Sequence, residues 1–181
     1  MTLFLAVLLP GLFLALLGGL LLWNDPRVSS TAKALPRSQR SAWLFFGASA
    51  VWFIWRLSRV GESDLIFFQQ PMPLMIGFGV LALLAFIYTP DFLAVRGLCI
   101  LMLMVAEPVL KAGYMNFEHW QINFYKVAVY LGLALALYLA AAPFRMRDFF
   151  EWLFGAPGRP RTLGALLLIY GLATSATAFI C

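Results

Sequence analysis

The stretch that decides the fold lies at positions 2–23, where the sequence reads TLFLAVLLPGLFLALLGGLLLW and contains no charged side chain over 22 residues. About 20 apolar residues in a helix cross the hydrocarbon core of a bilayer. A secretory signal peptide has a basic start and an apolar region of 7–15 residues. This stretch has no basic start, and its apolar region is longer. We therefore expect a retained membrane-spanning helix.

The composition of the whole chain agrees with a membrane protein. Of 181 residues, 63% are hydrophobic and only 12% are charged. An average soluble domain is roughly 45–50% apolar and about 25% charged. The charged side chains are too few to cover a water-facing surface, and a disordered chain needs the opposite composition. These values exclude a soluble globular enzyme and a disordered protein.

Five further apolar stretches follow, and a short amphipathic stretch lies before the last of them. Pro143 separates that amphipathic stretch from the fifth apolar one, and Arg147 and Glu151 within it are spaced to pair on a helix. The sequence predicts an all-α, polytopic membrane protein, a single integral membrane domain over residues 1–181. Its six transmembrane helices are expected at 2–23, 41–57, 71–88, 92–110, 124–142 and 162–181, with a short interfacial amphipathic helix at 144–154 between the fifth and the sixth.

The basic side chains predict how the chain is threaded. The odd-numbered connections between the expected spans hold nine lysines and arginines, and the even-numbered ones hold four. Cytoplasmic loops carry the excess of these residues, so both termini should lie on the non-cytoplasmic side. A five-span chain would put the two most basic connections on opposite sides, which favours six spans. The short connections are typical of a bacterial cytoplasmic (inner) membrane protein.

Charged residues in the fourth expected span form the main candidate site. Arg96 and Glu107 are eleven positions apart, which places them on one helix face about 16 Å from each other. Glu107 and Lys111 have the i, i+4 spacing of a helical ion pair. Pro108 removes one backbone hydrogen bond and is expected to kink the helix beside the carboxylate. Each charge costs about 2.5–3.5 kcal/mol at the centre of a membrane helix, so these residues need an explanation.

Two interpretations of this site stay open. In the functional one, Glu107 carries a proton or binds a cation, and Lys111 tunes its pKa. In the structural one, Arg96 and Lys111 extend to the headgroups at opposite ends, and Lys111 neutralises Glu107. A buried Glu107 that faces other helices would favour transport. A Glu107 that faces the headgroups would favour a structural role.

Three further polar residues are expected on the outer face. Arg56 and Arg59 end the second expected span, and Arg59 is spaced to pair with Glu62. Interfacial anchoring is the ordinary role of such arginines, and an anion site is the alternative. His119 lies beside Glu118 in an outer loop rich in aromatic residues, where it either titrates near neutral pH or has no role.

Small residues recur along the first and last spans and predict close helix packing in lipid, within the chain or between copies. They are Gly11, Ala15 and Gly19 in the first span, and Gly171, Ser175 and Ala178 in the last.

The chain has two cysteines and one histidine, without zinc spacing, and it contains no phosphate-binding loop or hydrolase motif. No catalytic residue, metal or cofactor is therefore predicted. The net charge of +5 is assigned to membrane lipids rather than to nucleic acid, and other membrane proteins are the further candidate partners. We expect a non-catalytic accessory, assembly or scaffold component of a membrane complex. The alternative is a small transporter or channel, coupled to protons through Glu107.

Overall fold

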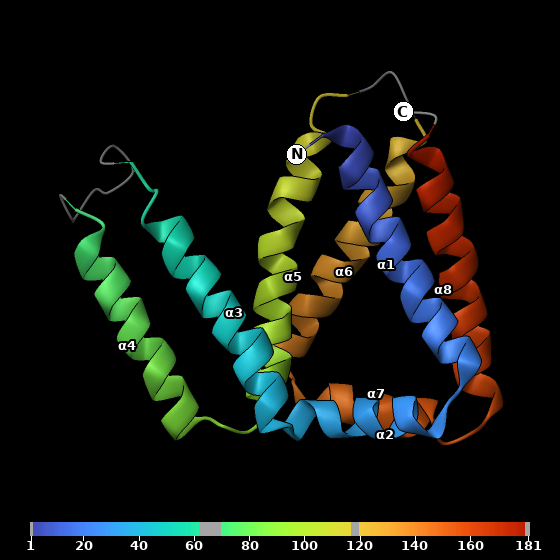
Figure 1. Cartoon of the computed structure of the whole chain (residues 1–181), viewed down its shortest axis with the longest axis horizontal. Coiled ribbons are helices and arrows are strands. Elements are labelled where there is room, and N and C mark those ends of the chain that lie inside the picture. The colour runs from blue at the N-terminus through green and yellow to red at the C-terminus, as the bar shows by residue number, and fades with distance from the viewer. Residues whose placement is uncertain (1, 62–69, 117–119, 180–181) are drawn as a thin grey trace.

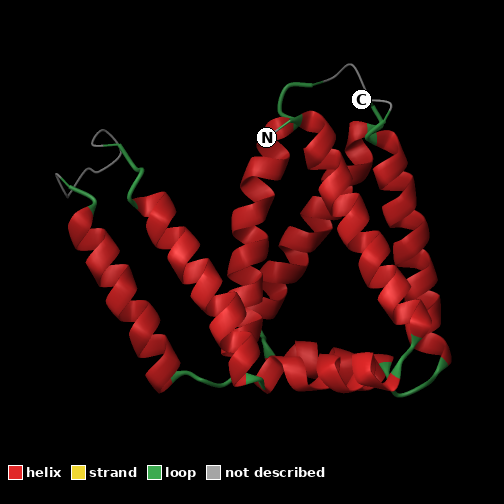
Figure 2. Ribbon diagram, in the orientation of Figure 1, coloured by secondary structure: helices red, strands yellow, loops and turns green. Residues whose placement is uncertain are grey.

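The computed structural model describes residues 2–61, 70–116 and 120–179, and in these ranges the regular structure is entirely helical. Figure 2 shows that no strand accompanies the helices in these described ranges. The long helices of this described part are α1 (Leu3–Trp23), α3 (Gln39–Leu57), α4 (Met72–Tyr88), α5 (Leu93–Ala112), α6 (Ile122–Ala141) and α8 (Gly158–Thr177). The short elements are α2 (Pro26–Ala34), the 3-10 turn η1 (Leu35–Arg37) and α7 (Phe144–Leu153).

Three of the described helices, α1, α5 and α6, are long and apolar enough to cross a membrane. The apolar helix α4 is shorter, at 17 residues. The prediction of an all-helical fold is confirmed, and the apolar helices indicate an integral membrane protein.

The long helices run between the two ends of the molecule. The short helices α2 and α7 lie across one of these ends (Figure 1). We call this the basal end. The start of α1 and the end of α8 lie at the opposite end, and α2 and α7 contact each other. The turn from α1 into α2 uses Asn24 in the left-handed conformation at φ 49°, a frequent way to end a helix. The backbone N–H of Arg27 then donates to the Asp25 carboxylate at 2.8 Å, which caps the start of α2.

Glycines bring α1 and α8 together along their length. A Cβ atom on Gly18 would lie 2.6 Å from the carbonyl oxygen of Gly164, and one on Gly171 would lie 2.7 Å from that of Gly11. Only residues without side chains permit such an approach of two backbones. Packing within the chain is thus confirmed for the small-residue pattern. The prediction that Gly19 belongs to this contact surface is wrong, because Gly18 faces α8 instead.

The helix α5 joins the remaining elements to this pair. Its Val95 and Cys99 are buried with Ala136 of α6 and Met146 of α7. On another face, Gly97 lies against the α3 backbone, where an added Cβ would come within 2.7 Å of the carbonyl carbon of Phe45. The helix continues through Pro108, within the bounds Leu93–Ala112.

Most expected helices agree with the observed bounds to within two residues. The largest difference is α8, which begins at Gly158 instead of residue 162. Pro160 lies in the first turn of α8, where its missing N–H costs nothing, so the Gly- and Pro-rich segment starts the helix instead of preceding it. Residues 180–181 of the expected last span lie outside the described residues. The stretch predicted at 144–154 is helical over Phe144–Leu153 and buries Met146 and Leu153.

Candidate polar site between α3 and α5

An ion pair connects the ends of α3 and α5. The Nη2 atom of Arg56 donates to Oε2 of Glu107, 51 positions further along the chain. The expected pair of Glu107 with Lys111 is wrong, because among the described residues Arg56 is the ion-pair partner of Glu107. The i, i+4 spacing identified a possible neighbour on the same helix. It could not show that the packing of α3 on α5 brings a guanidinium to the carboxylate.

The pair lies on the outside of the two helices. The side chain of Arg56 is 43% exposed and that of Glu107 is 53% exposed. Lys111, one turn beyond Glu107, is also exposed. The pair joins the two helices, but its contribution is modest because both side chains are about half exposed. Glu107 is therefore not buried among other helices, and burial there is the arrangement that would favour transport.

The other arginines singled out in the sequence lie apart from this pair. Arg59 places its guanidinium over the ring of Trp55, 4.2 Å from the ring centroid, in a cation–π contact. Arg96 is exposed near the start of α5, and in the described ranges no ion pair reaches it. The expected partners Glu62 and Glu118, and His119 itself, lie outside the described residues.

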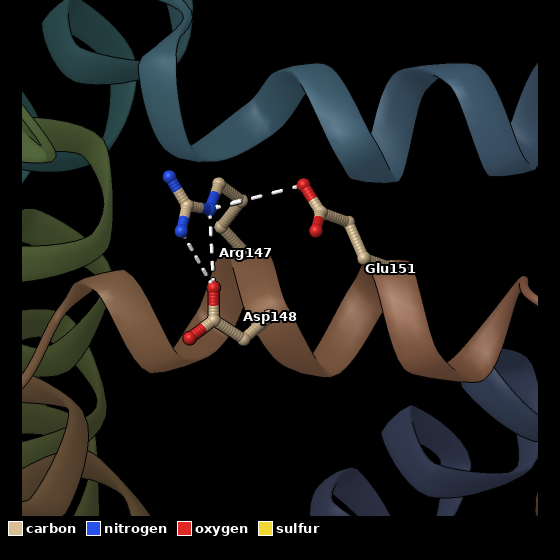
Figure 3. Close-up of polar contacts among 3 residues, drawn as sticks. All are labelled: Arg147, Asp148 and Glu151. Carbon is tan, nitrogen blue, oxygen red and sulfur yellow. Dashed lines mark hydrogen bonds and ion pairs between the residues drawn. The ribbon is translucent and has the colours of Figure 1, made fainter.

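A second charged cluster lies on α7, on the face turned toward α2 (Figure 3). Arg147 donates to Oδ1 of Asp148 from Nε at 3.1 Å and from Nη2 at 2.8 Å. The predicted pairing with Glu151 is present at 3.8 Å. The nearer partner, Asp148, was not foreseen. The hydrogen bonds to Asp148 and its negative charge raise the pKa of Arg147 above the ordinary value of an arginine.

Two hydroxyl groups on α8 donate to backbone carbonyls, one on α6 and one within α8 itself. The Tyr170 hydroxyl donates to the carbonyl oxygen of Phe124 on α6 at 2.8 Å. Thr174 is fully buried and donates to the carbonyl oxygen of Tyr170, also at 2.8 Å. Both bonds satisfy polar groups in an apolar interior, which explains their presence without a ligand.

Within the described ranges, no three histidine, cysteine or acidic side chains gather in a way that could hold a metal ion. Comparisons of the chain with protein-family models, with curated proteins and with solved structures give no match.

Proposed function

We propose that the chain is a six-span protein of a bacterial inner membrane, with both termini on the non-cytoplasmic side. The support is that the six long helices follow one another in alternating directions between the same two ends (Figure 1). The most basic connections, with α2 and α7, lie at the basal end. An excess of lysine and arginine is the mark of cytoplasmic loops. In this orientation α2 and α7 lie in the cytoplasmic headgroup region.

Single-cysteine labelling tests the topology. In a background with both natural cysteines replaced by serine, we expect Arg37→Cys and Met115→Cys to react with a membrane-impermeant maleimide from opposite sides of sealed vesicles. Arg37 lies at the basal end, and Met115 follows α5 at the other. Reaction of both cysteines from the same side would overturn the scheme.

For the function itself, we propose a non-catalytic accessory, assembly or scaffold component of a membrane complex. The observation that carries this proposal is the position of α4. This helix has no buried residue, and its main contacts are with α3 alone. Side chains such as Leu83, 64% exposed, and Ile76, 60% exposed, point away from the rest of the chain. A helix held from one side leaves the other side free to pack against a helix of another membrane protein.

Site-specific photocrosslinking tests this role in the native membrane. A photoreactive residue at Leu83 of α4 should give a discrete adduct with another membrane protein. The matched control is Leu166 of α8, which is 67% exposed and should give lipid adducts only. Lipid adducts alone at both positions would contradict an accessory role for α4.

A small proton-coupled transporter is the second candidate, because the Arg56–Glu107 pair joins α3 to α5 through charges at the edge of expected spans. Reconstitution into liposomes with an imposed proton gradient tests it. Proton flux that Glu107→Gln abolishes and Glu151→Gln leaves intact would favour transport over scaffolding. We expect no such flux, since Glu107 is half exposed on the outside of its helix pair.

A further inference from the structure

An open pocket of about 340 Å³ lies at the basal end, where α2, η1 and α3 meet. Its lining consists mainly of hydroxyl side chains with two small or apolar residues between them: Ser30, Thr31, Ala34, Leu35, Ser38 and Ser41. The pocket is separate from the Arg56–Glu107 pair, which involves the last turn of α3 at its other end. The volume is ample for a group of a few oxygen atoms.

The hydroxyl groups in this pocket include free donors. Ser30 is engaged locally, since its Oγ donates to the carbonyl oxygen of Arg27 at 3.0 Å. Ser38 accepts from the backbone N–H of Ser41 at 3.3 Å and thereby begins α3. The hydroxyls of Thr31 and Ser41 have no hydrogen-bond partner among the described residues. They can therefore donate to an acceptor that enters the pocket.

The residues next to this lining in sequence include three cations and no acid. Lys33, Arg37 and Arg40 are each adjacent in sequence to a residue of the lining. None of them forms an ion pair within the described ranges. The acids on the neighbouring helix α7, Asp148 and Glu151, are both paired with Arg147. Arg37 places its guanidinium over the ring of Phe92, 5.7 Å from the ring centroid. Lys33 and Arg40 remain, and beside free hydroxyl donors they favour an anion with several acceptor oxygens.

We propose that this pocket binds a phosphate group, presented by the headgroup of an anionic phospholipid at the cytoplasmic surface. The choice of a lipid rests on the proposed topology, which places the basal end among the cytoplasmic headgroups. There the hydroxyls contact the phosphate oxygens, and the nearby Lys33 and Arg40 attract the negative charge. The acyl chains continue along α3 beside Leu44, which is 65% exposed.

Native mass spectrometry of the delipidated full chain tests the site. The probes are phosphatidylglycerol, zwitterionic phosphatidylcholine and inorganic phosphate. We expect phosphatidylglycerol to bind at least tenfold more tightly than phosphatidylcholine. Ala34→Phe fills the pocket without a change of charge and should weaken phosphatidylglycerol binding about tenfold. Thr31→Val, a smaller change that removes only one free hydroxyl, should weaken it severalfold, and it keeps the test valid if Ala34→Phe does not fold.

A matched charge control separates a site from general attraction. Lys33→Gln with Arg40→Gln removes two positive charges beside the pocket and should weaken phosphatidylglycerol binding strongly. Arg145→Gln with Arg161→Gln removes two positive charges from the basal end away from the lining and should leave binding nearly unchanged. Inorganic phosphate that binds with the same dependence on these variants supports the phosphate site with a soluble ligand as its source.

Two results would overturn the proposal. The first is that none of the probes binds. The second is that Ala34→Phe and Thr31→Val leave binding unchanged while the two double variants weaken it equally. The maleimide labelling described above tests the topology separately. Lipid binding can therefore fail while the six-span scheme holds. A correct site on a wrongly oriented chain would still bind phosphate with the expected dependence on the variants.

Discussion

The α1–α8 pair and the α3–α4 pair are both built from apolar helices of similar length, but they are held together in different ways. Along α1 and α8, glycines bring backbone against backbone, so that a single added Cβ atom would collide with main-chain atoms. Between α3 and α4 the contacts come from aromatic side chains. Trp43 stacks on Phe86 at 4.3 Å between centroids, and Phe53 meets Phe78 edge-to-face at 5.0 Å.

This difference separates a structural part from an accessible one. Close backbone packing in lipid gains van der Waals contacts along a whole helix, and side chains cannot rearrange to replace it. A few ring contacts fix the position of α4 but leave its other side uncovered. We expect substitutions in the first pair to affect the stability of the molecule and substitutions in the second to affect what it can bind.

The largest effect should come from Gly18→Ala. The new Cβ would lie 2.5 Å from the backbone nitrogen of Leu168, which cannot move without a shift of α8. We expect a loss of about 1–3 kcal/mol in the free energy of unfolding, the usual range for overpacking, measured by chemical unfolding in detergent. The matched control is Gly19→Ala, whose Cβ would meet only the flexible Cδ1 of Leu168 at 4.0 Å. Equal losses in the two variants would show that the α1–α8 packing described here is incorrect.

A somewhat smaller effect should follow Gly97→Ala, which places a Cβ against the backbone of Phe46 where α3 crosses α5. The α3–α4 pair should separate from α5 while α1 and α8 stay together. Faster maleimide labelling of Ala42→Cys, buried at this contact, measures the separation. Gly77→Ala on α4 is the control, since nothing lies within 4 Å of its Cβ position. An unchanged labelling rate in Gly97→Ala would contradict the contact.

Next in size is Phe86→Leu, which removes the ring contacts with Trp43 and Phe46. Aromatic pairs contribute about 0.5–1.5 kcal/mol beyond the area they bury. We expect α4 to become more sensitive to limited proteolysis, with little change in the unfolding of the α1–α8 pair. Ile87→Leu, at a position 69% exposed, should have no effect. Global destabilisation by Phe86→Leu would remove the distinction between the two pairs.

The smallest effect should come from the Arg56–Glu107 ion pair, because both side chains are about half exposed. A double-mutant cycle with Arg56→Gln and Glu107→Gln should give a coupling of about 0.5–1 kcal/mol in the free energy of unfolding. Lys111→Gln should combine additively with Arg56→Gln. Coupling of Glu107 to Lys111, without coupling to Arg56, would restore the pairing expected from sequence spacing.

The sequence by itself determined the long helices, α7 and the apolar character of the chain, whereas the short helix α2 was not predicted. Long uncharged stretches such as 2–23 are local properties, and a helix satisfies its backbone hydrogen bonds within its own segment, so no knowledge of neighbours is needed. The same holds for α7, whose polar and apolar faces can be recognised within its ten residues. The bounds were therefore predictable to within a few positions.

Only the tertiary structure decided which residues meet. The partner of Glu107 is an arginine 51 positions away, and Gly18 rather than Gly19 faces α8. The hydroxyl-lined pocket likewise forms where three elements join, although Ser30, Thr31, Ser38 and Ser41 are individually unremarkable in the sequence. Each of these contacts depends on the relative rotation and crossing of helices. That geometry is set by the packing of all the side chains together, so a spacing rule for one helix cannot supply it.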